Sequence, residues 1–265
     1  MKFFIYFNLI AIFITSCNSV PLTGRRQLSL ISDAEVLSLS NQSFSDYMKT
    51  AKISSNQQQY LQITKVGTNI ATAVDTYLRN NGMGPDADTY QWQFVLVNDK
   101  TPNAFCLPGG KVIVNDGILS YTLDDDGLAV VLGHEIAHAV AHHSNERMSQ
   151  QALVQYGSTA ASELLGQSQG AARKALLEQV IGIGANVGII LPFSRKHESE
   201  ADHLGLIFMT MAGYDPNEAT AFWSRMAAAG GGKQAEFLST HPADEKRIAQ
   251  LKALIPEALK YKPQE

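Results

Sequence analysis

The stretch Val130–Val140 constrains the fold of this 265-residue chain more than any other, because it sets two histidines and a glutamate in an apolar run. It contains the pattern His134-Glu135-x-x-His138. Residues four apart in a helix lie on the same face, so both imidazoles would project from one side about one turn apart. Such a pair can supply two of the three protein ligands of a catalytic zinc ion, while Glu135 can reach a water held by the metal. The stretch therefore predicts a metal-binding helix.

A third ligand is needed, because the motif alone also fits a helix whose histidines face solvent. Ser194 is suited to cap a helix on which Glu198 and Asp202 share a face. Glu198 can complete the ligand set, and Asp202 can accept the free N–H of a metal-bound histidine and fix its tautomer. Glu200 points to another side and is a poorer candidate. A solvated charged helix face is the alternative interpretation of this segment.

The histidines that follow the motif do not offer a second metal scheme. We expect the helix to continue through Ala141, His142 and His143. The metzincin pattern would need a glycine and a histidine where the chain has Ala141 and Ser144. On a straight helix His142 would lie about 12 Å from His134, too far to share one zinc ion. His142 is therefore expected to be a supporting or surface residue.

The composition indicates a globular protein that does not bind nucleic acid. Hydrophobic residues make up 45% and charged residues 17% of the chain, which is enough apolar side chain for a core. The net charge is −4, and no stripe of lysine and arginine is present to neutralise phosphates. We predict a single domain over residues 32–265.

The N-terminus has the features of a targeting segment. Lys2 precedes an apolar run, Phe3–Ile14, that is too short to span a bilayer. The residues that follow, up to Cys17, resemble a bacterial lipobox. We therefore predict a lipoprotein signal peptide over residues 1–16 and a lipid-modified Cys17. An ordinary secretory signal with an incidental cysteine is the alternative.

Residues 17–31 are expected to tether the lipid to the domain. Arg25 and Arg26 lie in this tether, and we expect them to cap or pair with the surface of the domain. With Cys17 acylated, Cys106 would be the remaining thiol, and a role in core packing is favoured for it.

The body before the motif predicts two scaffold helices and a small sheet. Ser32 with Glu35 forms a capping box, and 57–80 has helical periodicity. Residues 91–97 predict a strand, and 104–114 predict a hairpin with a Pro-Gly-Gly turn. A substrate backbone could add to the edge of this hairpin, and the residues expected to contact it are Asn103, Ala104 and Phe105. The alternative is a sheet that only completes the core.

The C-terminal region offers two further candidates. His241 lies at the entry to a helix expected over 243–259, so its side chain can reach into a cleft, although a capping or surface role is the alternative. Arg247 can contact substrate carbonyls or a carboxylate, or pair with Asp244.

Together these motifs resemble the gluzincin family of HtpX-like and BepA-like metallopeptidases, which includes the CAAX prenyl endopeptidases, and in particular its soluble lipoprotein branch. The resemblance rests on His134–His138, Ser194–Asp202, Val20–Leu28, Asn103–Gly110 and Ser239–Pro242 with Arg247. It implies zinc held by His134, His138 and Glu198, with Glu135 as general base and Asp202 supporting a ligand. In BepA-like members a histidine at the position of His241 approaches the zinc site.

We predict an α+β, predominantly helical fold of the zincin type, with a small antiparallel sheet or hairpin beside the metal-binding helix and one Zn²⁺ per chain. The predicted function is a zinc metalloendopeptidase of the bacterial cell envelope that degrades misfolded or mis-assembled envelope proteins. We expect it to be lipid-anchored and periplasm-facing, on the outer rather than the inner membrane. Glu135 would move the proton, and His241 or Arg247 would stabilise the developing oxyanion.

Two alternatives remain open from the sequence. One is an envelope chaperone that binds unfolded proteins along Asn103–Val114 and uses zinc structurally. The other is a latent enzyme in which His241 occupies the fourth zinc position until a substrate displaces it.

Overall fold

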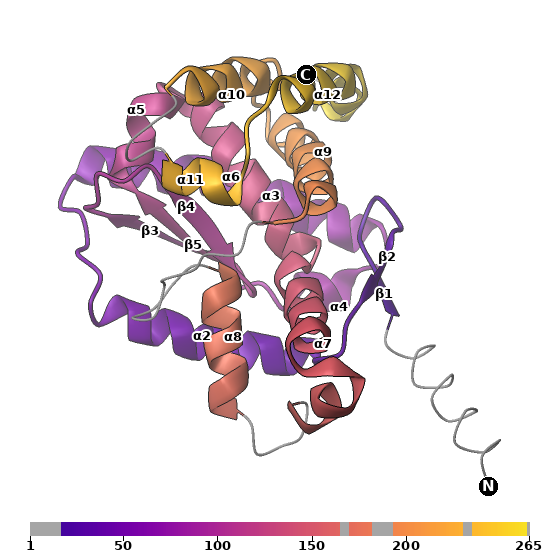
Figure 1. The fold of residues 1–265 in the computed structure, drawn as a ribbon. Helices are drawn as coiled ribbons and strands as arrows, with labels where there is room; N and C mark the ends of the chain where they lie inside the picture. The colour runs from indigo at the N-terminus through magenta and orange to yellow at the C-terminus, as the bar shows by residue number, and fades with distance from the viewer. Residues whose placement is uncertain (1–16, 165–169, 182–192, 230–234, 264–265) are drawn as a thin grey trace, which may run out of the picture.

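The computed structural model describes residues 17–164, 170–181, 193–229 and 235–263. The predicted signal peptide, residues 1–16, lies outside these ranges. The chain is predominantly helical, as predicted (Figure 1). Its longer helices are α2 (Asp33–Met48), α3 (Gln57–Asn80), α6 (Asp125–Val140), α7 (His143–Leu164), α8 (Gly170–Ile181), α9 (Arg195–Met211), α10 (Glu218–Ala228) and α12 (Glu245–Ala258). The shorter ones are α4 (Gly84–Ala87), α5 (Leu119–Thr122) and α11 (Ala235–Thr240), with 3₁₀ turns at Asp116–Ile118 and Leu259–Tyr261.

Local capping sets where several helices begin. The Ser32 side chain accepts the backbone N–H of Glu35 at the start of α2. The Asp124 carboxylate accepts the N–H of Gly127 at 2.9 Å at the start of α6. The Ser194 side chain accepts the backbone N–H of His197 at the start of α9. Each side chain satisfies a backbone donor that the helix itself leaves unpaired.

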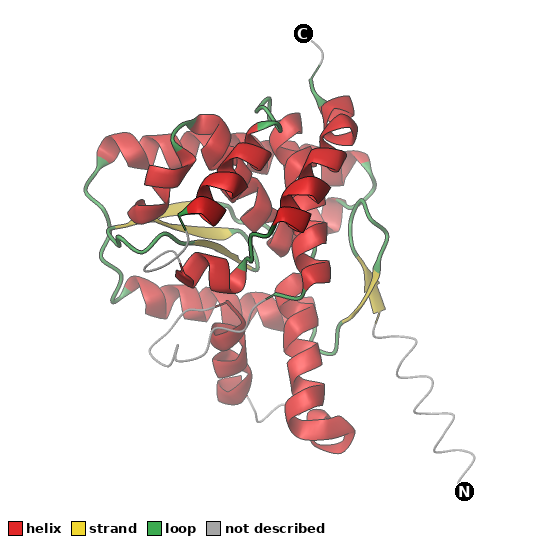
Figure 2. Cartoon of the chain, turned by 45° about the horizontal axis from the view of Figure 1, so that its top comes forward, coloured by secondary structure: helices red, strands yellow, loops and turns green. Residues whose placement is uncertain are grey.

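A three-stranded sheet lies beside α6, with helices on both sides of it (Figure 2). The strands are β3 (Gln93–Val97), β4 (Ala104–Leu107) and β5 (Lys111–Asn115), in the order β3-β5-β4. The hairpin of β4 and β5 is antiparallel, as predicted, but β5 pairs parallel with β3. The sheet is therefore mixed rather than antiparallel, because the returning strand β5 fits between β3 and β4. Its central position suits its apolar centre, Val112–Val114, which is fully buried.

The core forms around α6, which runs through the middle of the molecule (Figure 1). Every residue from Gly127 to Val140 is buried. One face of the sheet packs into this core, and Cys106 is part of it, as predicted. The other face, with Val95 and Ile113, packs against partly buried aromatic residues of α2.

The crossing of α6 and α9 is unusually close. A Cβ atom on Gly133 would lie 2.9 Å from the carbonyl oxygen of Gly205, and one on Gly205 would lie 2.9 Å from the amide of His134. Only glycine at both positions lets the two backbones approach this far. The crossing brings the motif of α6 against the N-terminal half of α9.

Two segments differ from the expectation. Residues 17–31 were expected to be a tether, yet β1 (Cys17–Ser19) and β2 (Arg26–Leu28) form an antiparallel hairpin, and β2 lies against α7. The helix predicted to continue through His143 instead ends at Val140, and His142 takes a left-handed φ of 53°. A new helix, α7, begins at His143. In the described part of the chain no helix has the length and apolar character needed to cross a bilayer.

Candidate metal centre

Four side chains from three segments converge inside the protein. They are His134 and His138 of α6, Glu198 of α9 and His241, which follows α11. Each is at most 5% exposed, and their candidate ligand atoms lie within 4.8 Å of one another. The structure thus brings together the three predicted metal ligands and His241, the histidine that the family resemblance places near the zinc site.

Four of the distances between these atoms are close to the edge length of a coordination tetrahedron. Nε2 of His134 lies 3.1 Å from Nε2 of His138 and 3.1 Å from Nδ1 of His241. Glu198 Oε1 lies 3.0 Å from Nδ1 of His241 and 3.3 Å from Nε2 of His138. Zinc–ligand bonds of about 2.0–2.1 Å in a tetrahedral site place the ligand atoms roughly 3.3 Å apart. The nitrogen and oxygen donors present therefore fit one zinc ion.

Glu135 lies beside this cluster with one oxygen unsatisfied. Its Oε1 is buried, makes no hydrogen bond with the described residues, and lies 3.5 Å from Nε2 of His241. Burial raises the pKa of the Glu135 carboxyl. A buried carboxylate oxygen without a partner is costly, and here it faces a cluster of metal-ligand atoms, which suits a group that handles a proton.

The cluster keeps a strong negative charge at Glu198. Against the effect of burial, His241 and His134 hold the pKa of this carboxyl well below its usual range. Burial lowers the pKa of His134, but Glu198 and Asp202 outweigh it and raise the pKa to about 9. The carboxylate is thus ionised, and a metal ion that binds Nε2 of His134 would displace a proton from that ring.

Asp202 and Arg247 hold the back of His134. Asp202 Oδ1 lies 3.0 Å from Nδ1 of His134, as the sequence predicted for a supporting residue. Arg247 donates from Nη2 and Nε to the two oxygens of Asp202, at 2.7 and 2.8 Å. Nη1 of Arg247 lies 3.0 Å from Glu198 Oε2. These contacts fix the ring of His134 with Nε2 toward the cluster.

Arg247 is buried, and it lines a pocket together with Glu198, Asp202 and Pro242, so its predicted contact with substrate stays a prediction. Its side chain is 7% exposed, and its guanidinium stacks 3.5 Å above the ring of Trp223. The expected pairing with Asp244 takes another form: Asp244 accepts the backbone N–H of Arg247 as a helix cap, while the Arg247 side chain pairs with Asp202 and Glu198. Arg247 therefore orders the cluster from behind.

Because α6 ends at Val140, His143 lies next to His138, a contact that the sequence did not predict. Nδ1 of His143 lies 2.9 Å from Nδ1 of His138, behind the candidate ligand. Helical spacing gave no signal for this contact, because it depends on the left-handed turn at His142. His142 itself is half-buried and pairs with Asp33 at 3.3 Å, away from the cluster.

The cavity next to Glu135 lies along the predicted substrate strand. Asn103, Ala104 and Phe105 line it together with Phe193 and His241. About 20 Å³ of it is open to the centres of water molecules, which suffices for about one water. The edge strand and the cluster are thus adjacent, but a peptide needs more room than this conformation provides.

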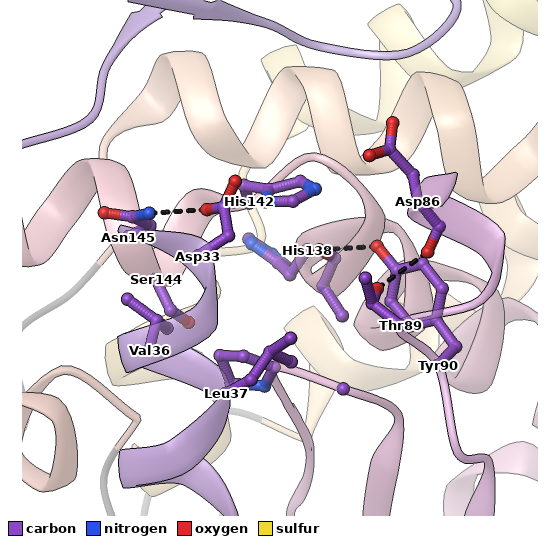
Figure 3. Close-up of a pocket in the computed structure, with 13 residues that line it drawn as sticks. Asp33, Val36, Leu37, Asp86, Thr89, Tyr90, His138, His142, Ser144 and Asn145 are labelled. Atoms are coloured by element: carbon purple, nitrogen blue, oxygen red, sulfur yellow. Dashed lines mark hydrogen bonds and ion pairs between the residues drawn. The ribbon is translucent and has the colours of Figure 1, made fainter. Parts of the chain in front are cut away.

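A second pocket opens on the other side of His138 (Figure 3). Asp33, Leu37 and Tyr90 form its walls, and the Tyr90 hydroxyl donates to the carbonyl of Ala139 at 3.4 Å. About 50 Å³ of this pocket is open to water centres. It shares His138 and Ser144 with the cavity beside Glu135.

Comparison with known proteins identifies related peptidases. The model of the family described as peptidase family M48 matches residues 66–255. The chain is 44% identical over 173 residues to the mitochondrial metalloendopeptidase OMA1 of Schizosaccharomyces pombe, which covers 63% of this chain and 48% of the relative. It is 30% identical over 261 residues to the human mitochondrial metalloendopeptidase OMA1, covering 96% and 48%. It is also 30% identical over 163 residues to the beta-barrel assembly-enhancing protease of Escherichia coli, covering 60% and 33%. The chain spans about half the length of the two OMA1 relatives and 33% of the length of the Escherichia coli protease.

These comparisons correct one prediction from the sequence. The location expected from the N-terminal motif, a bacterial cell envelope with the protein facing the periplasm, is wrong. Relatives from fungi, a plant and vertebrates are named as mitochondrial, and several of them are more similar to the chain than the bacterial ones. A short apolar run before a cysteine is a weak local signal, and the resemblance of Val20–Leu28 to lipoprotein members supported the same location.

Proposed function

The chain belongs to peptidase family M48, and from that premise we propose that it cleaves internal peptide bonds with one zinc ion held by His134, His138 and Glu198. A zinc ion in such a site polarises the scissile carbonyl and lowers the pKa of water. The observation that carries the proposal is the tetrahedral spacing of the buried ligand atoms, with Glu135 beside them.

In this proposal Glu135 moves the proton. Its carboxylate accepts a proton from the attacking water and returns it to the nitrogen of the leaving amine. Burial raises its pKa, which brings the carboxyl nearer to the range in which it can both take and release a proton. Asp202, held by Arg247, keeps His134 in the tautomer that leaves Nε2 free.

The test is the Glu135→Gln variant. We expect it to retain one zinc per chain, measured by elemental analysis, and to lose at least about 100-fold in cleavage of an unfolded casein substrate, in the range of a lost general base. The matched control is Glu245→Gln, an exposed glutamate at the start of α12, which should cleave like the wild type. Wild-type activity in the Glu135 variant would refute the mechanism.

A second proposal concerns the resting state, because His241 stands where a substrate or water would bind. Its Nδ1 occupies the fourth corner of the cluster, and its ring packs against Phe193 and Phe237. We propose that the enzyme is latent until this histidine moves away. The small volume of the adjacent cavity supports this.

The His241→Asn variant tests latency. If His241 blocks the site, basal cleavage rises several-fold, whereas a fall would show that His241 serves the reaction itself, as in oxyanion stabilisation. His203→Asn is the control, because His203 lies on α9 but pairs with Glu257 at 3.1 Å.

We further propose that unfolded or mis-assembled polypeptides are the substrates and that they add as a strand to the edge of β4, where Asn103, Ala104 and Phe105 line the cavity. The chaperone alternative predicts a different result. A chaperone would still suppress aggregation of an unfolded protein when Glu135 is replaced by Gln, and it would show no cleavage in the wild type.

Lipidation of Cys17 also remains a proposal. The cysteine follows the lipobox-like residues and begins strand β1. Intact-mass measurement of the mature protein tests it. The wild type should carry the added mass of its acyl chains, whereas the Cys17→Ser variant, which lacks the thiol, should not. A mature chain without a lipid mass would refute it.

A further inference from the structure

A line of buried contacts runs from the N-terminal hairpin to the candidate ligand His138. We propose that Arg25, Glu200 and His143 are positioning residues, which hold His138 in the orientation and tautomer that a metal requires. The inference rests on the proposed zinc site and names a part of its support that lies far away in the sequence. In this view the N-terminal hairpin is a structural part of the metal centre.

The line begins at the ring of His138. Its Nε2 faces the cluster, 3.1 Å from Nε2 of His134. Its other nitrogen, Nδ1, lies 2.9 Å from Nδ1 of His143. On the far side of that ring, Nε2 of His143 lies 3.0 Å from Oε2 of Glu200. His143 is fully buried, and its ring also lies against that of His197, with the two centroids 4.6 Å apart.

The protons along this line can be ordered in one way that serves a metal. A carboxylate only accepts, so Nε2 of His143 donates to Glu200. The singly protonated His143 then has a lone pair at Nδ1, which accepts the N–H of His138. That leaves Nε2 of His138 without a proton and directed at the cluster. The carboxylate of Glu200 thus sets the tautomer of a ligand that it does not touch.

Glu200 is itself fixed from the N-terminal hairpin. The Thr23 hydroxyl donates to its Oε1 at 2.6 Å, and Nε of Arg25 donates to its Oε2 at 2.7 Å. The terminal nitrogens of Arg25 donate to both oxygens of Glu146 on α7, at 3.0 and 2.7 Å. Glu146 also receives Nε2 of His197 at 3.1 Å. One guanidinium therefore joins the hairpin to α7 and α9 at the place where His143 meets Glu200.

The chemistry of arginine explains why this residue occupies the junction. The planar guanidinium presents several donors in a fixed fork, so it can bind two carboxylates at once in defined directions. A lysine would bring the charge but not the geometry. The side chains of Arg25, Glu146 and Glu200 are only 13%, 8% and 6% exposed, so water does not replace these contacts readily.

The experiment measures zinc affinity by competition with a chelator, together with the visible absorption spectrum of the cobalt-substituted protein. His143→Phe removes both hydrogen bonds, and we expect zinc affinity to fall about 10- to 100-fold. His143→Gln keeps one acceptor and one donor, and should restore most of the loss. Arg25→Gln should weaken zinc binding by up to about tenfold, and Arg25→Lys should not rescue it. Arg26→Gln, at the exposed neighbouring position in the same hairpin, is the matched control.

A merely structural role would give another pattern. In that case Arg25→Gln and His143→Phe would lower the melting temperature of the metal-free protein, but zinc affinity and the cobalt spectrum would match the wild type. That result, or equal losses in the Phe and Gln variants of His143, would overturn the proposal. Because the readout is metal binding, it can succeed even if Glu135→Gln shows no effect on cleavage, so the two proposals fail separately.

Discussion

The two histidines of the motif are held from behind in different ways. Asp202 contacts His134 directly and accepts hydrogen bonds from Arg247. His138 instead contacts the imidazole of His143. His143 contacts Glu200, and Glu200 accepts a hydrogen bond from Arg25. We call the first set the C-terminal clamp and the second the N-terminal clamp. The carboxylates of both clamps come from α9, two residues apart, which places them about 200° apart around the helix.

The comparison shows how one helix can support two ligands on different sides. The C-terminal clamp joins residues 45 positions apart, whereas Arg25 and Glu200 are 175 positions apart. The C-terminal clamp also holds the candidate ligand Glu198, at 3.0 Å from Arg247. Its loss should therefore cost more than the loss of the N-terminal clamp.

Replacing Arg247 by Leu should give the largest effect. The change leaves Glu198 and Asp202 buried without their cation, which costs on the order of 3–5 kcal/mol in unfolding free energy. Urea denaturation of the metal-free protein measures this loss. Arg195→Leu, at an exposed position of α9, is the control. A loss no greater than that of the control would mean that the clamp does not order the core.

Replacing Gly205 by Ala should weaken both clamps together. The added methyl would meet the amide of His134 at 2.9 Å, and backbone cannot move aside as a flexible side chain can. We expect a loss of about 1–3 kcal/mol, as for an overpacked core, and a lower zinc affinity because α9 must shift. Among the described residues, no atom lies within 4 Å of the methyl that Gly170→Ala would add, so this change should be tolerated. Unchanged zinc binding in Gly205→Ala would argue that the close crossing is not needed for the site.

The N-terminal clamp should make stability depend on acid. Against burial, His197 and Arg25 hold the pKa of Glu146 at about 2, and His143, Thr23 and Arg25 hold that of Glu200 at about 2, below the usual 4.5. A carboxyl whose pKa is lower in the folded state stabilises the protein above pH 4.5, and this stabilisation disappears as the pH falls toward 2. Replacing Arg25 by Gln should reduce the acid-sensitive part of the unfolding free energy by on the order of 1–2 kcal/mol. Denaturation curves at a series of pH values measure it, and a slope equal to that of Arg26→Gln would contradict the assignment.

Much of the fold follows from local patterns in the sequence. The bounds of α3 agree with the predicted 57–80, and the hairpin of β4 and β5 lies where the Pro-Gly-Gly turn indicated. Capping by Ser32 and Ser194 was also readable. These features depend on residues a few positions apart, whose preferences act before any tertiary contact forms.

Two other features, the order of the strands and the end of α6, could not be predicted from local patterns. The parallel pairing of β3 with β5 depends on which strand fills the centre of the sheet. The end of α6 was missed because nothing in the letters around His142 forbids a continuous helix, and yet the backbone turns left-handed there. That turn brings His143 behind His138 and makes the N-terminal clamp possible.

Local spacing in the sequence identified the candidate ligands on each helix. The helical spacing of His134 with His138, and of Glu198 with Asp202, predicted which side chains share a helix face, because a helix carries its own geometry. Tertiary packing places His241 in the same cluster, which the family resemblance suggested and residue spacing could not show. It also pairs Arg25 and Arg247, from opposite ends of the chain, with carboxylates of α9. The physical reason is that such contacts depend on where separate helices cross, here at Gly133 and Gly205, and no local pattern records that distance.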